Sequence, residues 1–443
     1  MKFINTIKNI FSIEELKNRI LTTLLFIAVF RFGAHVVLPG VDPDLVGGEL
    51  KNGLLGLLDL FVGGAFSQRS IFGLGIMPYI SASIIIQLAT FAIPSFQKMQ
   101  KEGESGRKKI NQYTRFLTIA VCLLQSIGFI ELILNNDTSL LSQGVNPFYF
   151  RIQSMILLTA GTMFCLWMGE KITEKGIGNG VSLLIMIGII ARLPQALIAE
   201  WGARNGMDGI LVLLIEAVVL FLITMGTVAL VQAVRRVPIS YAKNIVDNKV
   251  YGGQRDYIPL KVNIAGVMPI IFAQAVMVVP GFIVNPLTKD SDAASWFATH
   301  FLNPLSWGYN ALFALLIILF TYFYTAIIVN PQEMADGLKK NGGFIPGVKP
   351  GKDTANYIDM ILSKITFPGA LAIAFIAILP AFARMFGVNN AMATFYGGTS
   401  LLIMVGVVLD TLQQIESYLL MKHYEGMMKT GKVRGRTQNV PVA

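Results

Sequence analysis

Apolar residues run along this chain in long stretches that are separated by short polar segments. A stretch of about 20 apolar residues is long enough to cross the roughly 30 Å hydrocarbon layer of a membrane as a helix. Ten stretches meet this description, and they lie near residues 20–38, 74–93, 116–135, 152–169, 181–199, 210–234, 263–284, 309–330, 367–386 and 394–415. The pattern therefore predicts an all-α polytopic membrane protein with ten transmembrane helices.

One further apolar segment, from Leu54 to Phe66, is too short to cross the membrane. As a helix it would span roughly 20 Å, and it is interrupted by Gly63 and Gly64. A short segment that leads into a full span is typical of a re-entrant helix. Such a helix is tolerated only where protein buries it or where it lines a cavity. We therefore expect a cavity within the membrane, with this segment folded into it.

The chain repeats itself across a shift of five spans. GIMP at 75–78 recurs as GVMP at 266–269, and SLLIM at 182–186 recurs at 400–404. Because five is odd, the matched spans cross the membrane in opposite directions, which defines an inverted repeat. We expect two halves, residues 1–205 and 206–443. Inverted repeats place a functional site between the halves, near the middle of the membrane.

The middles of the four matched spans are apolar rather than charged. Aligning the repeats pairs one isoleucine of each first-half span with one of the second half, and two more aliphatic residues lie one helical turn away on the same helix faces. The six positions are Ile80, Ile84, Val181, Ile185, Ile271 and Ile403. Together they could form an apolar collar, which blocks ions by dewetting without a charged filter. Ordinary helix packing or contact with lipid is the alternative interpretation.

Composition agrees with a membrane protein and argues against most enzyme classes. Hydrophobic residues make up 54% of the chain and charged residues only 14%, whereas a soluble domain carries about 25% charged residues. The glycines at 176, 178 and 180 lie between two spans and lack the Lys-Ser/Thr pair of a phosphate-binding loop. No HExxH pair or GxSxG motif occurs. The sequence predicts no catalytic residues, no metal site and no cofactor.

Basic residues are distributed unequally between the two sides of the predicted membrane topology. Lys and Arg number 28 in the termini and the loops after even-numbered spans, against 7 in the other loops. The positive-inside rule places both termini in the cytoplasm. Two long cytoplasmic loops, 235–262 and 331–365, combine glycines and proline with basic residues as hairpin tips do. These loops are candidate docking surfaces for a cytoplasmic partner, and the tail at 416–443 is predicted to lie on the same side of the membrane.

Two other functions remain open at this point. A secondary transporter for a small solute also uses inverted repeats, but it usually carries ionisable residues near the membrane midplane. Glu131, Glu216 and Asp410 lie toward the ends of their spans instead. An intramembrane protease would need a metal or nucleophile arrangement that the sequence lacks. The pattern favours a passive channel that is unselective toward its substrate yet tight to ions.

Several long stretches resemble the SecY/Sec61-alpha family, the channel subunits of protein translocases. They are GLGIMPYISASIIIQL (73–88), WMGEKITEKGIGNGVSL (167–183), KEGESGRKKINQYTR (101–115), PLKVNIAGVMP (259–269), NPQEMADGLKKNGGFIPGVKPG (330–351) and YGGTSLLI (396–403). The matches run through nearly the whole chain. The resemblance implies a clamshell hinged between spans 5 and 6, which opens sideways between spans 2 and 7, and it implies that the six collar positions form the pore ring.

The resemblance also implies roles for further residues. The short apolar segment would be the plug, with the residues Leu54, Leu57, Leu60, Phe61, Gly63 and Gly64. Glutamines in spans 2, 3 and 7 would lie at the lateral gate, namely Gln87, Gln125 and Gln274. Basic residues of the cytoplasmic face would contact a ribosome or motor ATPase, namely Arg107, Arg255 and Lys349. The family often has arginine where Lys349 stands, and lysine lacks the bidentate geometry of arginine.

The resemblance also implies which partners the protein has and in which membrane it lies. The partners would be the SecE and SecG subunits, the SecA motor ATPase, the ribosome, signal sequences and nascent polypeptides, membrane lipid, and the accessory proteins YidC and SecDF. The protein would be a multi-pass protein of the bacterial cytoplasmic (inner) membrane. As a passive channel it would translocate secretory polypeptides and insert membrane proteins, with energy from a partner.

Overall fold

The computed structural model describes residues 13–42, 59, 62–136, 145–204, 207–241, 243–246, 249–252, 255–274, 276–277, 296–302 and 306–429. The helices are α2 (Glu14–Gly33), α4 (Met77–Ala92), α5 (Pro94–Lys101), α6 (Glu104–Asn136), α7 (Pro147–Lys175), α8 (Gly180–Ala203), α9 (Met207–Gln232), the π-helical turn η3 (Ala298–Leu302), α12 (Trp307–Ile328), α13 (Pro331–Lys340), α14 (Lys352–Met385), α15 (Asn390–Ala393) and α16 (Gly398–Lys429).

Most of the ten predicted membrane-spanning helices are present in the described part of the chain. Within the described residues, seven helices are long and apolar enough to cross a membrane: α6, α7, α8, α9, α12, α14 and α16. An eighth span results if α4 and α5 are taken together, although the chain bends by 99° between them. The first predicted span, 20–38, overlaps α2, which carries charged residues at both ends. In the seventh predicted span, the described residues 268–274 and 276–277 are helical.

Local sequence signals explain where several helices begin. Asn146, Asn179 and Asn330 precede α7, α8 and α13, and each side chain accepts a hydrogen bond from a backbone N–H of the first helical turn. This bond satisfies a donor that has no partner within the helix. Proline follows Asn146 and Asn330 directly, at the first helical position, where its missing N–H costs nothing.

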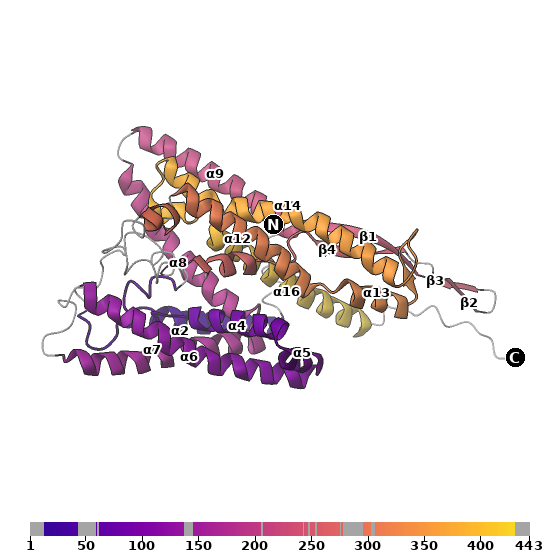
Figure 1. The fold of residues 1–443 in the computed structure, drawn as a ribbon, viewed down its shortest axis with the longest axis horizontal. Helices are drawn as coiled ribbons and strands as arrows, with labels where there is room; N and C mark the ends of the chain where they lie inside the picture. Colours follow the sequence, from indigo (N-terminus) through magenta and orange to yellow (C-terminus); the bar gives the residue numbers. More distant parts are fainter. Residues whose placement is uncertain are drawn as a thin grey trace.

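The helices form two groups that correspond to the two halves of the sequence (Figure 1). In the first group α4 packs on α6, α6 on α7, and α2 on α7. In the second group α12 packs on α14, and α16 contacts both α9 and α14. Helix α8 packs on α7 of its own half and also contacts α15 and α16 of the other. The seam between the halves therefore runs along α8.

A small β structure occupies the segment predicted as the first long loop. Strand β1 (Val234–Tyr241) pairs with β4 (Arg255–Lys261) in antiparallel register, with Val237 opposite Ile258. Between them, β2 (Lys243–Val246) and β3 (Lys249–Gly252) form a second antiparallel pair. The hairpin predicted for this loop is thus confirmed.

The second long loop is more ordered than the sequence suggested. Residues 331–365 contain α13, the short strand β5 (Gly343–Phe344) and the first turns of α14. Strand β5 pairs with β1, where Ser240 lies opposite Phe344. Val237 and Ile239 of β1, Ile345 after β5 and Ile358 of α14 form one buried apolar cluster. The two loops therefore fold together, and we call strands β1–β5 with α13 the β unit.

The β unit lies at one end of the molecule, and α5 with the start of α6 lies at the same end (Figure 1). These elements follow the second, sixth and eighth predicted spans. The predicted topology requires these segments to share one face of the membrane, and their positions agree with it.

Candidate functional site

Four of the six collar positions meet in one apolar cluster between the halves. Ile80 of α4, Val181 and Ile185 of α8, and Ile403 of α16 all belong to it. Ile185 is 9% exposed and Ile403 is 5% exposed, so both are buried. We call this group, with the residues packed around it, the central apolar cluster.

Ile84 and Ile271 lie outside the central apolar cluster. Ile84 is buried elsewhere along α4, one turn beyond Ile80, and Ile271 is half-buried. The seventh span reaches the cluster instead through Val267, one turn before Ile271. Because one helical turn advances about 5.4 Å along the axis, residues that share a helix face can still lie at different depths.

A small cavity adjoins the central apolar cluster. It is lined by Phe30, Val62, Gly75, Ile76, Met77, Ile80, Leu184 and Ile185. Val62 comes from the segment predicted as the plug, whereas Ile80 and Ile185 are collar positions. The segment predicted to plug the channel and two of the collar residues therefore line the same cavity.

The described part of the expected plug is folded into turns rather than a helix. We call Asp59 with residues 62–70 the plug segment; Leu54, Leu57, Leu60 and Phe61 lie outside the described residues. Gly63 and Gly64 are buried with φ of +67° and +91°. This left-handed conformation is accessible to glycine at little cost but breaks an α-helix. The predicted interruption at Gly63 and Gly64 is therefore present in the structure.

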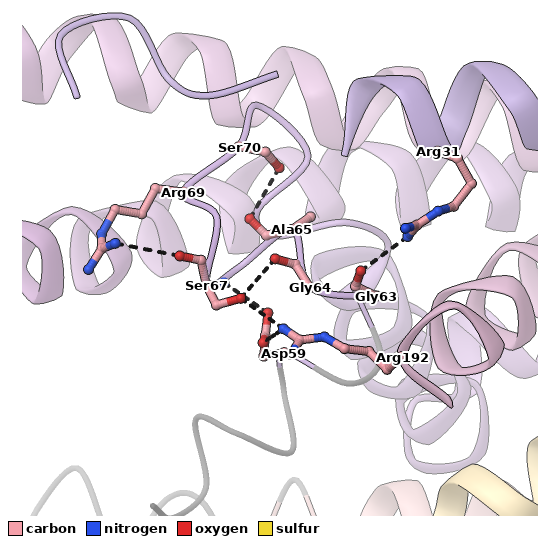
Figure 2. A network of polar contacts seen from close by, with 9 residues as sticks. All are labelled: Arg31, Asp59, Gly63, Gly64, Ala65, Ser67, Arg69, Ser70 and Arg192. Carbon is pink, nitrogen blue, oxygen red and sulfur yellow. Dashed lines mark hydrogen bonds and ion pairs between the residues drawn. The ribbon is translucent and has the colours of Figure 1, made fainter. Parts of the chain in front are cut away.

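Polar contacts hold the plug segment against α2 and α8, as Figure 2 shows. Asp59, which is 5% exposed, forms an ion pair with Arg192 of α8 and accepts a hydrogen bond of 2.8 Å from the Ser67 backbone N–H. The Arg192 guanidinium also donates to Ser67 Oγ at 2.8 Å. On the other side, Arg31 of α2 donates to the carbonyl of Gly63 at 3.1 Å.

Sequence analysis did not predict this network. The signal that could have indicated it is the presence of Asp59, Arg31 and Arg192 in or beside apolar stretches, where a charge is costly unless it has a partner. The pairing itself joins residues 133 positions apart. Neither helical periodicity nor the internal repeat relates them.

The three predicted gate glutamines do not come together. Gln87 of α4 accepts a 2.7 Å hydrogen bond from the Tyr324 hydroxyl of α12, so it links the two halves. Gln125 is half-buried on α6. Gln274 lines a cavity of the second half, beside Tyr309 and Arg384. Among these three, Gln87 alone has a hydrogen bond across the seam in the described structure.

Both ends of α8 are fixed to the second half by polar groups. At its start, the Gly178 backbone N–H donates to Gln414 Oε1 of α16 at 2.8 Å. At its end, Glu200 accepts from the Asn389 backbone N–H at 2.8 Å, and Arg204 contacts Glu200 at 3.1 Å and Glu216 at 2.5 Å. Burial alone would lower the pKa of Arg204, but hydrogen bonds and charge from both carboxylates raise it above its ordinary value, so the guanidinium stays charged.

The basic residues predicted to dock partners lie at the end of the molecule that holds the β unit. Arg107 is exposed in the first turn of α6, and Arg255 is the first residue of β4. Lys349 is exposed in the turn between β5 and α14, where its carbonyl accepts a 2.9 Å hydrogen bond from Thr354 Oγ1. The backbone that carries Lys349 is therefore fixed while its ammonium group faces solvent.

The chain is similar to known proteins in both sequence and fold. The SecY family model matches residues 70–412. The protein translocase subunit SecY of Corynebacterium glutamicum is 43% identical over 438 residues, which cover 95% of this chain and 98% of the relative. The corresponding subunit of Escherichia coli K12 is 42% identical, with 95% and 96% covered.

Solved structures share the fold at low sequence identity. A protein-conducting channel superposes with a TM-score of 0.58 and 15% identity, covering 90% of this chain and 92% of that chain. A SecY protein whose plug domain stabilises the closed state and maintains a membrane seal gives 0.55 and 16%, with the same coverage. The idle yeast Ssh1 complex on the 80S ribosome gives 0.58 and 14%, covering 96% and 94%.

Proposed function

The chain belongs to the SecY family, and from this premise we propose that it is the pore-forming subunit of a protein translocase, with its pore at the central apolar cluster. This channel conducts secretory polypeptides across the membrane and releases membrane proteins sideways into lipid. Family membership favours this function over the solute transporter and the intramembrane protease considered above.

One observation supports the position of the pore most directly. Aliphatic side chains from α4 and α8 of the first half and α16 of the second meet in one buried cluster, and the plug segment adjoins it. Stiff β-branched side chains can close around a threaded chain without forming hydrogen bonds to it. A dry constriction of this kind resists ions because water and charge are both excluded.

The proposed mechanism is passive. A signal sequence or nascent transmembrane segment enters between α4 and the seventh span, beside Gln87 and Tyr324. The halves part along α8, the plug segment moves away from Ile80 and Ile185, and the polypeptide threads between the aliphatic side chains. The driving energy comes from a bound partner.

The proposed partners are those of a bacterial translocase. SecE and SecG, the SecA motor and the ribosome would bind this subunit, and YidC and SecDF would cooperate with it. The exposed positions of Arg107 and Lys349, at the end that carries the β unit, support docking there. We place this end in the cytoplasm and the protein in the bacterial cytoplasmic membrane, with both termini inside, on the strength of the Lys and Arg distribution.

The pore assignment is tested by cross-linking. A secretory chain arrested during translocation should cross-link to cysteines placed singly at Ile80, Ile185 and Ile403. Cysteine at Val408, which is exposed on the same helix as Ile403, serves as the control and should remain unreactive. Equal cross-linking at Ile403 and Val408 would argue against a pore at the central apolar cluster.

Tyr324→Phe should loosen the seam between α4 and α12. The change removes the hydroxyl that donates to Gln87, and a hydrogen bond of this kind contributes about 0.5–1.5 kcal/mol. We expect substrates with a weakened signal sequence to be translocated about two- to tenfold faster, which an export assay measures. Tyr322→Phe on the same helix is the matched control. If both changes had the same effect, loss of the hydrogen bond to Gln87 would not be the cause of the faster translocation.

A further inference from the structure

The plug segment is attached to the first half of the molecule at several independent points. Its ion pair and hydrogen bonds reach Arg192 of α8 and Arg31 of α2. Its apolar side chains pack on the same half: Phe66 meets Phe129 of α6 edge-on, with ring centroids 4.7 Å apart. The partners named here all come from residues before 206.

The plug segment also approaches α8 at van der Waals distance. A Cβ placed on Gly63 would lie 2.7 Å from Gly188 Cα, and a Cβ on Gly64 would lie 2.9 Å from Arg192 Nε. Two glycines in left-handed conformation thus let the backbone touch α8 directly. This close approach brings Asp59 and Ser67 to the same guanidinium (Figure 2).

Separating Asp59 from Arg192 is expected to be costly in free energy. Asp59 is 5% exposed, and its carboxylate has both a guanidinium and a backbone N–H as partners. When one member of a buried pair is removed, the other remains desolvated without compensation, which is strongly unfavourable. Moving the plug segment away from α8 has the same consequence for Asp59 and Arg192 until water reaches them.

We infer that Asp59 and Arg192 form a latch that holds the plug segment on the first half, so that plug release is a step separate from the parting of the halves. Parting at the seam separates α8 from α15 and α16 but leaves α8 beside the plug segment. The latch therefore has to break in its own right. This inference rests on the proposed function, because it assigns a control element to the proposed plug.

The test uses the full-length channel in proteoliposomes with Ala65→Cys as a reporter. Ala65 is 1% exposed within the plug segment, and the native Cys122 and Cys165 are fully buried. Two readouts are taken: labelling of position 65 by a membrane-impermeant maleimide, and resting ion conductance. Deletion of residues 54–66 gives the upper limit of the conductance.

Arg192→Gln and Asp59→Asn should each raise both labelling and resting conductance, by at least about fivefold. The charge-swapped variant, Asp59→Arg with Arg192→Asp, should return both readouts toward the parent, which a merely misfolded protein would not do. Gln414→Ala, which removes the contact from Gly178 across the seam, should leave the labelling of position 65 unchanged.

The outcomes separate the latch from the proposed function. Higher labelling without higher conductance would support the latch but overturn the idea that the plug segment seals the channel. Unchanged labelling in both single variants would overturn the latch, whatever the conductance does. Failure of the charge-swapped variant to recover would also overturn it, because the pairing of charges would then not be the cause.

Discussion

Replacing Ile403 with asparagine is expected to make the resting channel leak ions. Ile403 is 5% exposed and packs in the central apolar cluster with Ile185 of the other half. A buried amide without partners costs about 1–3 kcal/mol and attracts water into a region that is otherwise dry. The closed state loses this free energy, so the population of conducting channels should rise about five- to 150-fold.

Single-channel or liposome conductance measures this effect directly. Val408→Asn places the same amide on an exposed position of α16 and should leave the resting conductance at the parental level. Ile403→Val, which keeps the side chain apolar and branched, should leak far less than the asparagine variant. If the Ile403→Asn channel had the same resting conductance as the parent, the central apolar cluster would not be the barrier to ions.

Reversing the charge at Lys349 is expected to slow partner-driven translocation about tenfold or more. The Lys349 side chain is exposed on a turn whose backbone is fixed by Thr354 and by buried Ile345. A charge displayed on a rigid turn attracts an acidic partner surface and fixes its register, and the opposite charge repels it. Lys349→Arg should at least preserve the rate, because arginine adds bidentate hydrogen bonding.

The initial rate of motor-driven translocation into proteoliposomes measures this prediction. Lys339→Glu makes the same charge change at an exposed position of α13. It distinguishes an effect specific to the Lys349 turn from an effect of the overall charge on this face of the protein. Resting conductance should be unchanged in both variants. If both slow translocation equally, the effect is one of general electrostatic attraction, and the assigned role of Lys349 is wrong.

The sequence predicted the membrane-spanning architecture well, because membrane-spanning helices can be recognised from the order of residues along the chain alone. A helix that crosses the membrane must satisfy all its backbone groups internally, so length and hydropathy alone reveal it. The inverted repeat added which spans face one another, and it correctly brought Ile185 and Ile403 together. It did not resolve depth along a helix, which is why Val267 rather than Ile271 reaches the cluster.

What the sequence did not predict depends on contacts between distant residues. The pairing of Asp59 with Arg192 is one example, and the pairing of β1 with β5 is another, since Ser240 and Phe344 are joined only in the fold. Helix α13 could have been recognised, because Met334 and Leu338 are spaced one turn apart and both pack into the apolar cluster of the β unit. Its glycine and lysines instead suggested a loop.

The joining of the two long segments into one β unit has a mechanical consequence. Helix α14 starts beside the turn that carries Lys349 and extends for 34 residues, about 51 Å, with Pro368 and Pro380 in its interior. A force that a partner applies at this turn would therefore act directly on helix α14. Because β5 pairs with β1, and β1 directly follows α9, a force on this turn would also reach α9 of the second half.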